Sequence, residues 1–204
     1  PNFAKKLLGQ IVFLYFVQKK GWLGVEMGAN WGSGPKDFLR RLFDQENGVA
    51  YANFFNDVLE PLFYDALAES REGNRFSLGG YTCQIPFLNG GLFEPMGGYD
   101  WRKTALLLPN ALFSNRKSAE DDSGTGILDV FDRYNFTVWE EEPLDKEVAV
   151  DPEMLGKVFE NLLEVQDRKS KGAFYTPREI VHYMCQESLI NYLETAVNGD
   201  GETR

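Results

Sequence analysis

The residues from Phe174 to Glu179, F-Y-T-P-R-E, are of types that together can hold an anionic ligand. Thr176 suits a helix N-cap and Pro177 the first helical position, and Glu179, three residues after Thr176, completes a capping box. The backbone N–H groups at such a helix start attract carboxylates, and two aromatic rings, Phe174 and Tyr175, stand directly before them. A capping box needs no ligand, so an ordinary helix start is the alternative interpretation.

No catalytic residue or metal site is predicted from the rest of the chain. His182 is the only histidine, and no second histidine, cysteine or carboxylate set accompanies it at ligand spacing. Cys83 and Cys185 form no C-x-x-C pair, so we expect reduced core thiols in a cytoplasmic protein. The apolar run from Ile11 to Val17 is far shorter than the roughly 20 residues of a membrane span.

One local cluster of cations, Arg168, Lys169 and Lys171, leads into the F-Y-T-P-R-E stretch. Cations at the end of a helix interact favourably with its dipole, which is one explanation of the cluster. A contact with a DNA phosphate is the other explanation, although three charges make a small footprint.

Four sequence words, in this order, resemble the adenine-specific (N6) DNA methyltransferases of large restriction–modification enzymes, in particular the Eco57I-like fused endonuclease and methylase type. Residues 172–177, G-A-F-Y-T-P, resemble motif X of these methyltransferases, and residues 151–164 resemble the helix that precedes motif X. Residues 86–94, P-F-L-N-G-G-L-F-E, resemble an upstream loop, and residues 10–21 resemble a helix near the start of that region.

The resemblance implies an S-adenosylmethionine cofactor, DNA as partner and methyl transfer to adenine N6. It further implies that Phe174, Tyr175, Thr176 and Pro177 line the methionine end of the cofactor pocket. A glycine-rich cofactor loop and an Asn/Asp-Pro-Pro-aromatic motif are expected in this family, and neither occurs in the 204 residues. We therefore expect an excised fragment that is inactive alone and works with a downstream methylase domain in cis.

The chain carries a formal charge of −10, which argues against a main DNA clamp, because phosphate binding needs clustered Lys and Arg. This acidity favours a second interpretation, a helical protein-interaction module without catalytic or cofactor role. The presence of an endonuclease, the DNA recognition sequence and the oligomeric state do not follow from the sequence.

Hydrophobic periodicity predicts a mainly α fold, a multi-helix bundle with a small β-hairpin-like element. Residues 1–147 are expected to form a helical module, and residues 148–204 to begin the methylase domain. A hairpin is predicted from strands at 81–88 and 92–93 around Asn89-Gly90, and residues 114–126 are expected to be exposed and mobile. Helices are predicted at 4–20, from Pro35 to just before Gly48 with a buried stripe within 38–43, at 51–70 with a kink near Asp57 caused by Pro61, and at 127–134. A further helix is predicted to begin at Asp151-Pro152 with its buried face within 154–163, a last helix from Pro177, and a short strand at 135–139. The last helix is expected to bury one face formed by Ile180, Val181, Met184, Cys185 and Leu189.

Overall fold

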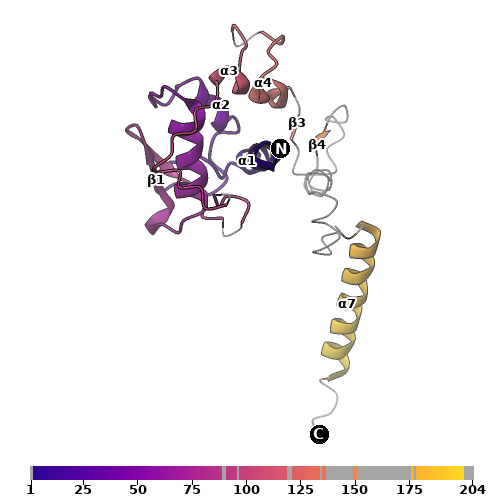
Figure 1. Ribbon diagram of the computed structural model, residues 1–204. Coiled ribbons are helices and arrows are strands. Elements are labelled where there is room, and N and C mark those ends of the chain that lie inside the picture. Colours follow the sequence, from indigo (N-terminus) through magenta and orange to yellow (C-terminus); the bar gives the residue numbers. More distant parts are fainter. Residues whose placement is uncertain are drawn as a thin grey trace. The chain divides into compact units, whose positions relative to one another are not determined.

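A computed structural model of the chain describes residues 2–88, 91–95, 97–118, 121–133, 135–136, 149–150, 176 and 178–199. The chain divides into two compact units, Pro1–Leu155 and Gly156–Arg204, each described here by itself (Figure 1). The domain boundary predicted between residues 147 and 148 was defined by function as well as by packing. That boundary stays a prediction.

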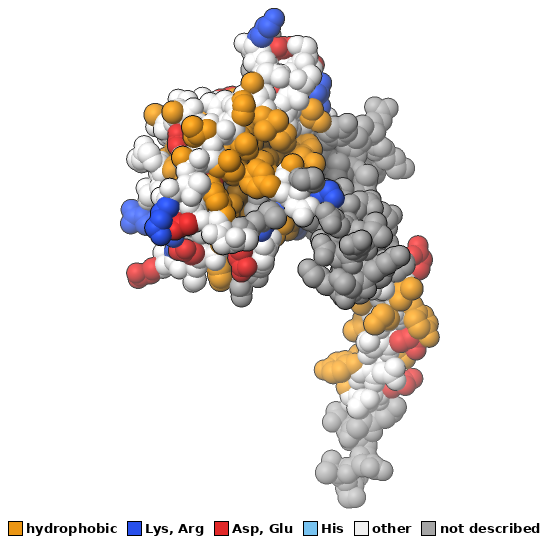
Figure 2. Space-filling view, viewed as in Figure 1, with side chains coloured by type: hydrophobic (Ala, Val, Ile, Leu, Met, Phe, Trp, Pro, Cys, Tyr) orange, Lys and Arg blue, Asp and Glu red, His pale blue; other side chains and the backbone are white. Residues whose placement is uncertain are grey.

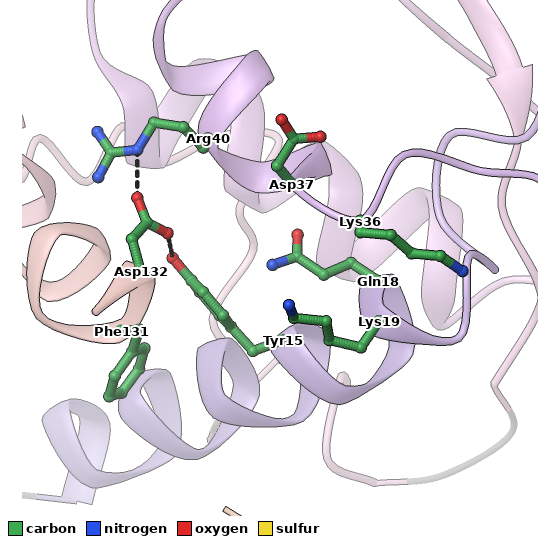
Figure 3. Close-up of a pocket in the computed structure, with 8 residues that line it drawn as sticks. All are labelled: Tyr15, Gln18, Lys19, Lys36, Asp37, Arg40, Phe131 and Asp132. Carbon is green, nitrogen blue, oxygen red and sulfur yellow. Dashed lines mark hydrogen bonds and ion pairs between the residues drawn. The ribbon is translucent and has the colours of Figure 1, made fainter. Parts of the chain in front are cut away.

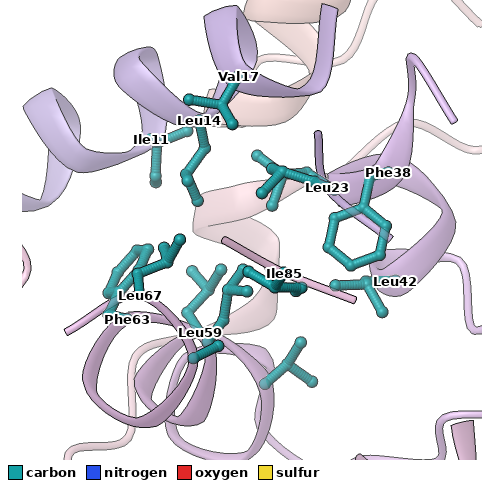
Figure 4. Close-up of a cluster of buried hydrophobic side chains, with 14 of the residues drawn as sticks. Ile11, Leu14, Val17, Leu23, Phe38, Leu42, Leu59, Phe63, Leu67 and Ile85 are labelled. Carbon is teal, nitrogen blue, oxygen red and sulfur yellow. The ribbon is translucent and has the colours of Figure 1, made fainter. Parts of the chain in front are cut away.

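Helix α1, Asn2–Lys19, forms one wall of the core of the first unit. Its sequence is apolar nearly all round, and the helix is correspondingly buried at Ile11, Leu14 and Val17, as predicted. In Figure 4 these side chains point toward Leu59 and Phe63, which come from another helical segment. The short helix α2, Phe38–Phe43, adds Phe38 and Leu42 to the same cluster.

The helix predicted at 51–70 is present, but its hydrogen bonding differs from that of an α-helix. It consists of two π-helical stretches, η1 (Phe55–Leu59) and η2 (Pro61–Leu67). The backbone N–H groups of Glu60 and Ala68 bond to carbonyls five residues back. Pro61 has no N–H to donate and its ring would meet a carbonyl in an α-helix, so wider turns accommodate it.

The small antiparallel sheet contains one of the two predicted strands, at 81–84, but its partner strand precedes it in the chain instead of following it. A one-turn 3-10 helix, η3 (Glu72–Asn74), leads into strand β1 (Arg75–Leu78), which pairs with β2 (Tyr81–Gln84). The turn is Gly79-Gly80, with φ of 56° and 90°, a conformation that glycine adopts without strain. Leu92 and Phe93 form a bend and not a strand, and Asn89-Gly90 lies outside the described residues.

Residues 110–136 form short elements that close the first unit. Helix α3 spans Asn110–Phe113, α4 spans Ile127–Asp132, and β3 (Asn135–Phe136) pairs in parallel with β4 (Ala149–Val150). The loop at 114–126, which was predicted to be exposed and mobile, is held at both ends. Ser114 is buried, and Asn115 and Thr125 exchange two hydrogen bonds of 2.8 and 2.9 Å. That expectation was therefore wrong for the ends of the loop.

The described part of the second unit is Thr176 and helix α7, Arg178–Gly199. The mainly α class is confirmed by these elements together with the two-stranded antiparallel sheet, whereas the bundle arrangement stays a prediction. Among the described helices, none has the length and apolarity that crossing a membrane requires.

Candidate functional site

The predicted cofactor-binding residues lie directly before α7. Phe174, Tyr175 and Pro177 lie outside the described residues, and Thr176 is exposed. Helix α7 begins at Arg178, so the predicted helix start is confirmed, and Glu179 lies in its first turn. The capping box itself and the binding of a cofactor stay predictions.

The face of α7 that we expected to be buried is exposed. The exposed fractions are 50% for Ile180, 59% for Met184 and 61% for Leu189, and Cys185 is also exposed. Apolar residues occur on other sides of the helix as well, for example Tyr183 and Ile190, so the apolar residues of α7 form no single stripe. Figure 2 shows these hydrophobic side chains on the helix surface. A helix that is apolar on several sides is typical of one covered by other protein.

Two further predicted features, the Arg168, Lys169 and Lys171 cluster and the helix at 151–163, lie outside the described residues. His182 is exposed on α7. Within the described ranges, no group of three or more His, Cys, Asp or Glu side chains is placed to hold a metal ion.

The first unit contains a pocket of about 170 Å³ where the end of α1, the start of α2 and the end of α4 meet (Figure 3). Its lining contains cationic, anionic and aromatic groups. The lining residues are Tyr15, Gln18, Lys19, Lys36, Asp37, Arg40, Phe131 and Asp132.

Arg40 is buried beside this pocket, and three carboxylates surround its guanidinium group. Its Nη2 donates to Asp129 Oδ1 at 2.9 Å and its Nε to Asp132 Oδ2 at 2.6 Å, while Asp44 lies 3.7 Å away. Tyr15 donates its hydroxyl to Asp132 at 2.7 Å. Burial and then the Asp132 carboxylate raise the pKa of Tyr15 well above its ordinary value, so the hydroxyl keeps its proton.

Asp129 is the most strongly stabilised carboxylate of this network. Burial by itself would raise its pKa, but hydrogen bonds from Ser114, the Asn115 backbone and Arg40 outweigh burial and lower the pKa to about 2. Asp129 and Asp132 of this network already accept hydrogen bonds from Arg40 and from neighbouring groups. The network therefore holds α4 against α2, and neither carboxylate is a free base for catalysis.

A pH dependence of stability follows from Asp129. A carboxyl whose folded-state pKa is depressed stabilises the fold fully above its unfolded pKa and loses this contribution as the pH falls through the folded pKa. We expect the free energy of unfolding to fall between pH 3.8, the ordinary value, and about pH 2. Urea unfolding at a series of pH values measures this slope. Asp129→Asn should flatten it, and an equally steep slope in that variant would contradict the assignment.

This network around Arg40 was not predicted from the sequence. Arg40 and Arg41 are adjacent in one short helix, yet the Arg40 side chain is 8% exposed and that of Arg41 is 43% exposed. The available signal was the pair Asp129 and Asp132, which stand three residues apart on one face of a predicted helix.

The segment P-F-L-N-G-G-L-F-E, residues 86–94, contacts α1, and this contact was not predicted from its sequence. Gln10 donates its amide nitrogen to the Leu92 carbonyl at 2.8 Å, and Lys6 Nζ bonds to the carbonyls of Gly91 and Glu94. Phe93 is 2% exposed. Two of the sequence words that carry the family resemblance, residues 10–21 and 86–94, therefore contact each other.

Comparison with known proteins gives one informative similarity. Over 194 residues, 92% of this chain, it is 30% identical to the "putative type II restriction enzyme and methyltransferase" of Methanocaldococcus jannaschii. The chain spans 14% of the length of that relative. No protein-family model matches the chain, and no solved structure matches it. The resemblance read from the sequence words is thus confirmed at a coarse level: the chain is related to a restriction–modification methyltransferase.

Proposed function

We propose that this chain is part of an S-adenosylmethionine-dependent DNA adenine-N6 methyltransferase of the Eco57I-like restriction–modification type. In this proposal, Phe174, Tyr175, Thr176 and Pro177 form one wall of the cofactor pocket. The observation that carries the proposal is the similarity over 92% of the chain to a relative whose name includes both a restriction enzyme and a methyltransferase.

The start of α7 supports the position of the cofactor wall. The helix begins at Arg178, directly after the F-Y-T-P word, and Thr176 is exposed. With 22 residues, α7 is long enough to carry a full helix dipole, whose positive end lies at this start. The methionine part of the cofactor carries a carboxylate, which is the kind of group that free helix N–H groups bind.

The reaction itself is assigned to a methylase domain that acts in cis. One wall does not make a pocket, so the 204 residues alone should bind the cofactor weakly and should not methylate DNA. In the proposed reaction the target adenine is flipped out of the duplex into the site of that domain.

We expect Phe174→Ala/Tyr175→Ala, made in the full-length protein, to weaken S-adenosylmethionine binding by about tenfold or more, because two aromatic contacts are removed. Isothermal titration calorimetry measures the affinity, and thermal unfolding checks that the variant is folded. Tyr192→Ala is the matched control, since Tyr192 is an aromatic residue on α7, the helix that follows Phe174 and Tyr175 in the chain, and is 70% exposed. Equal affinities for the double variant and the wild type would contradict the cofactor role.

A second candidate function, an acidic protein-interaction module, is favoured by one observation. Helix α7 exposes large apolar side chains, among them Tyr183 (62%), Leu193 (56%) and Val197 (73%). Exposed apolar groups of this kind mark contacts with other protein. The double variant separates the two functions, because only the methyltransferase interpretation predicts a loss of cofactor affinity.

A further inference from the structure

Three lysines gather around one loop of the first unit, although they are separated in sequence. Lys19 is the last residue of α1, Lys20 follows it and precedes the loop, and Lys36 follows the loop. Lys19 and Lys36 line the same pocket, and Lys36 Nζ donates to the Gly32 carbonyl at 3.3 Å. Residues 19–36 hold three lysines and one glutamate, a net charge of +2 in a chain of charge −10.

The loop between the lysines, residues 21–34, is closed on itself by backbone hydrogen bonds. The N–H groups of Gly32 and Gly34 both donate to the Gly21 carbonyl, at 3.1 and 2.9 Å. Gly21 has a φ of 69°, and a Cβ added there would stand 2.3 Å from the Gly32 oxygen. The backbone at the two ends of the loop approaches too closely to leave room for a side chain at Gly21. The closed loop therefore holds the backbone of Lys20 and Lys36, which flank it, at defined positions.

The pocket beside the loop is lined by the side chain of a buried glutamine. Gln18 is 2% exposed, and its Oε1 accepts the Leu39 N–H at 3.0 Å. Its side chain lines the pocket together with Lys19 and Lys36. In Figure 3 the amide nitrogen of Gln18 and the ammonium of Lys19 point to the same side. An amide NH2 and an ammonium are both hydrogen-bond donors, so this arrangement favours an acceptor group as ligand.

The carboxylates near the pocket are already neutralised by other groups. Asp132 accepts from Arg40 and from the Tyr15 hydroxyl, and Asp37 pairs with Arg41 Nε at 2.8 Å. Within the described part of the chain, no carboxylate lies at ion-pair distance from Lys19, Lys20 or Lys36. These ammonium groups therefore remain available for an external anion.

The loop also exposes large apolar side chains between the cations. Trp22 is 41%, Met27 46% and Trp31 43% exposed, and Lys20 Nζ lies 5.8 Å from the centre of the Trp22 ring. Exposed indoles interleaved with lysines are typical of surfaces that bind nucleic acid, where cations contact phosphates and rings contact sugars or bases.

We infer that the surface formed by Gln18, Lys19, Lys20, Trp22, Trp31 and Lys36 contacts the backbone of the DNA substrate, with one phosphate at the mouth of the pocket. This inference rests on the proposed function, because it assigns a DNA contact to the same enzyme. The small net charge matches an auxiliary contact of two or three phosphates, which leaves the main DNA clamp to other parts of the enzyme.

The test uses the full-length protein and a DNA duplex that it methylates. Lys19→Ala/Lys20→Ala/Lys36→Ala should weaken duplex binding by on the order of tenfold and lower the salt dependence of log K by about two. Fluorescence anisotropy at several salt concentrations measures both. Lys5→Ala/Lys103→Ala/Lys117→Ala removes the same charge elsewhere on the unit and should leave both unchanged.

A second variant tests the pocket without removing a lysine. Gln18→Glu keeps the acceptor for the Leu39 N–H but replaces the amide donor with a negative charge. We expect it to weaken duplex binding, which is measured at a temperature where thermal unfolding shows that the variant is folded. Unchanged duplex binding in this variant would show that the pocket is not part of the DNA contact.

The outcomes separate the inference from the proposed function. If the two triple-lysine variants weaken duplex binding equally, the proposed DNA-contact surface is wrong, even if the enzyme methylates DNA. Selective weakening by the Lys19, Lys20 and Lys36 triple supports the surface even if calorimetry shows no cofactor binding. A wild-type protein that binds no DNA would overturn the inference as well.

Discussion

Arg40→Ala is expected to lower the free energy of unfolding by about 3–5 kcal/mol, because it removes one partner from a buried ion-pair network. The side chain of Asp129 is 3% exposed, and without the guanidinium group its charge stays buried with only neutral hydrogen-bond donors. Asp132 and Ser114 lose a partner in the same change. Urea unfolding of the 204-residue chain, followed by tryptophan fluorescence, measures the loss.

Arg41→Ala is the matched control for this prediction. Arg41 is the next residue of α2 and pairs with Asp37, but both side chains are about half exposed, at 43% and 55%. Exposed pairs of this kind contribute little, so the control should unfold like the wild type. A loss of less than about 1 kcal/mol in Arg40→Ala would show that the network is no stronger than a surface ion pair.

Phe93→Ala should cost about 3–5 kcal/mol, the usual range for a phenylalanine removed from a packed core. Phe93 belongs to the L-N-G-G-L-F-E word, and its ring lies 5.9 Å from that of Phe13 and 5.7 Å from that of Phe63. It therefore joins α1 and η2 through a segment without regular structure. The same unfolding experiment, with calorimetric melting as a second readout, measures the change.

Phe87 provides the comparison within the same segment. It is only partly buried, so Phe87→Ala should lose clearly less stability than Phe93→Ala. Similar losses in the two variants would mean that the segment acts through its backbone and not through the buried ring.

The positions of the helices followed from the sequence because their periodicity is strong. The apolar residues of α1 and the T-P-R-E start of α7 predicted both helices to within a few residues. The hairpin was misplaced because Asn89-Gly90 and Gly79-Gly80 are both good turn signals, and local preference does not decide which strands pair. The π-helical bonding near Pro61 was missed because the proline was taken to bend an α-helix.

The candidate sites depend on contacts between distant segments, which periodicity does not reveal. Gln18 accepts a hydrogen bond from the backbone N–H of Leu39, 21 positions later. Lys36 donates to the Gly32 carbonyl of the loop that follows Lys20. The position of Gln18 in the pocket lining has no signature in the sequence, since glutamine inside an apolar helix suggests only a tolerated polar residue. The start of α7 could be predicted because its own residues define it, whereas the role of Phe174 and Tyr175 before it stays a prediction.

The buried arginine has a consequence for the order of folding during synthesis. Arg40 bonds to Ser114 and Asp132, which follow it by 74 and 92 residues. While the ribosome extends the chain, the guanidinium group stays hydrated until both partners have left the exit tunnel. Contacts of such long sequence separation form slowly, and domains complete only after their last element emerges. The first unit should therefore reach its native packing only after α4 has been translated, although α1 and α2 are made much earlier.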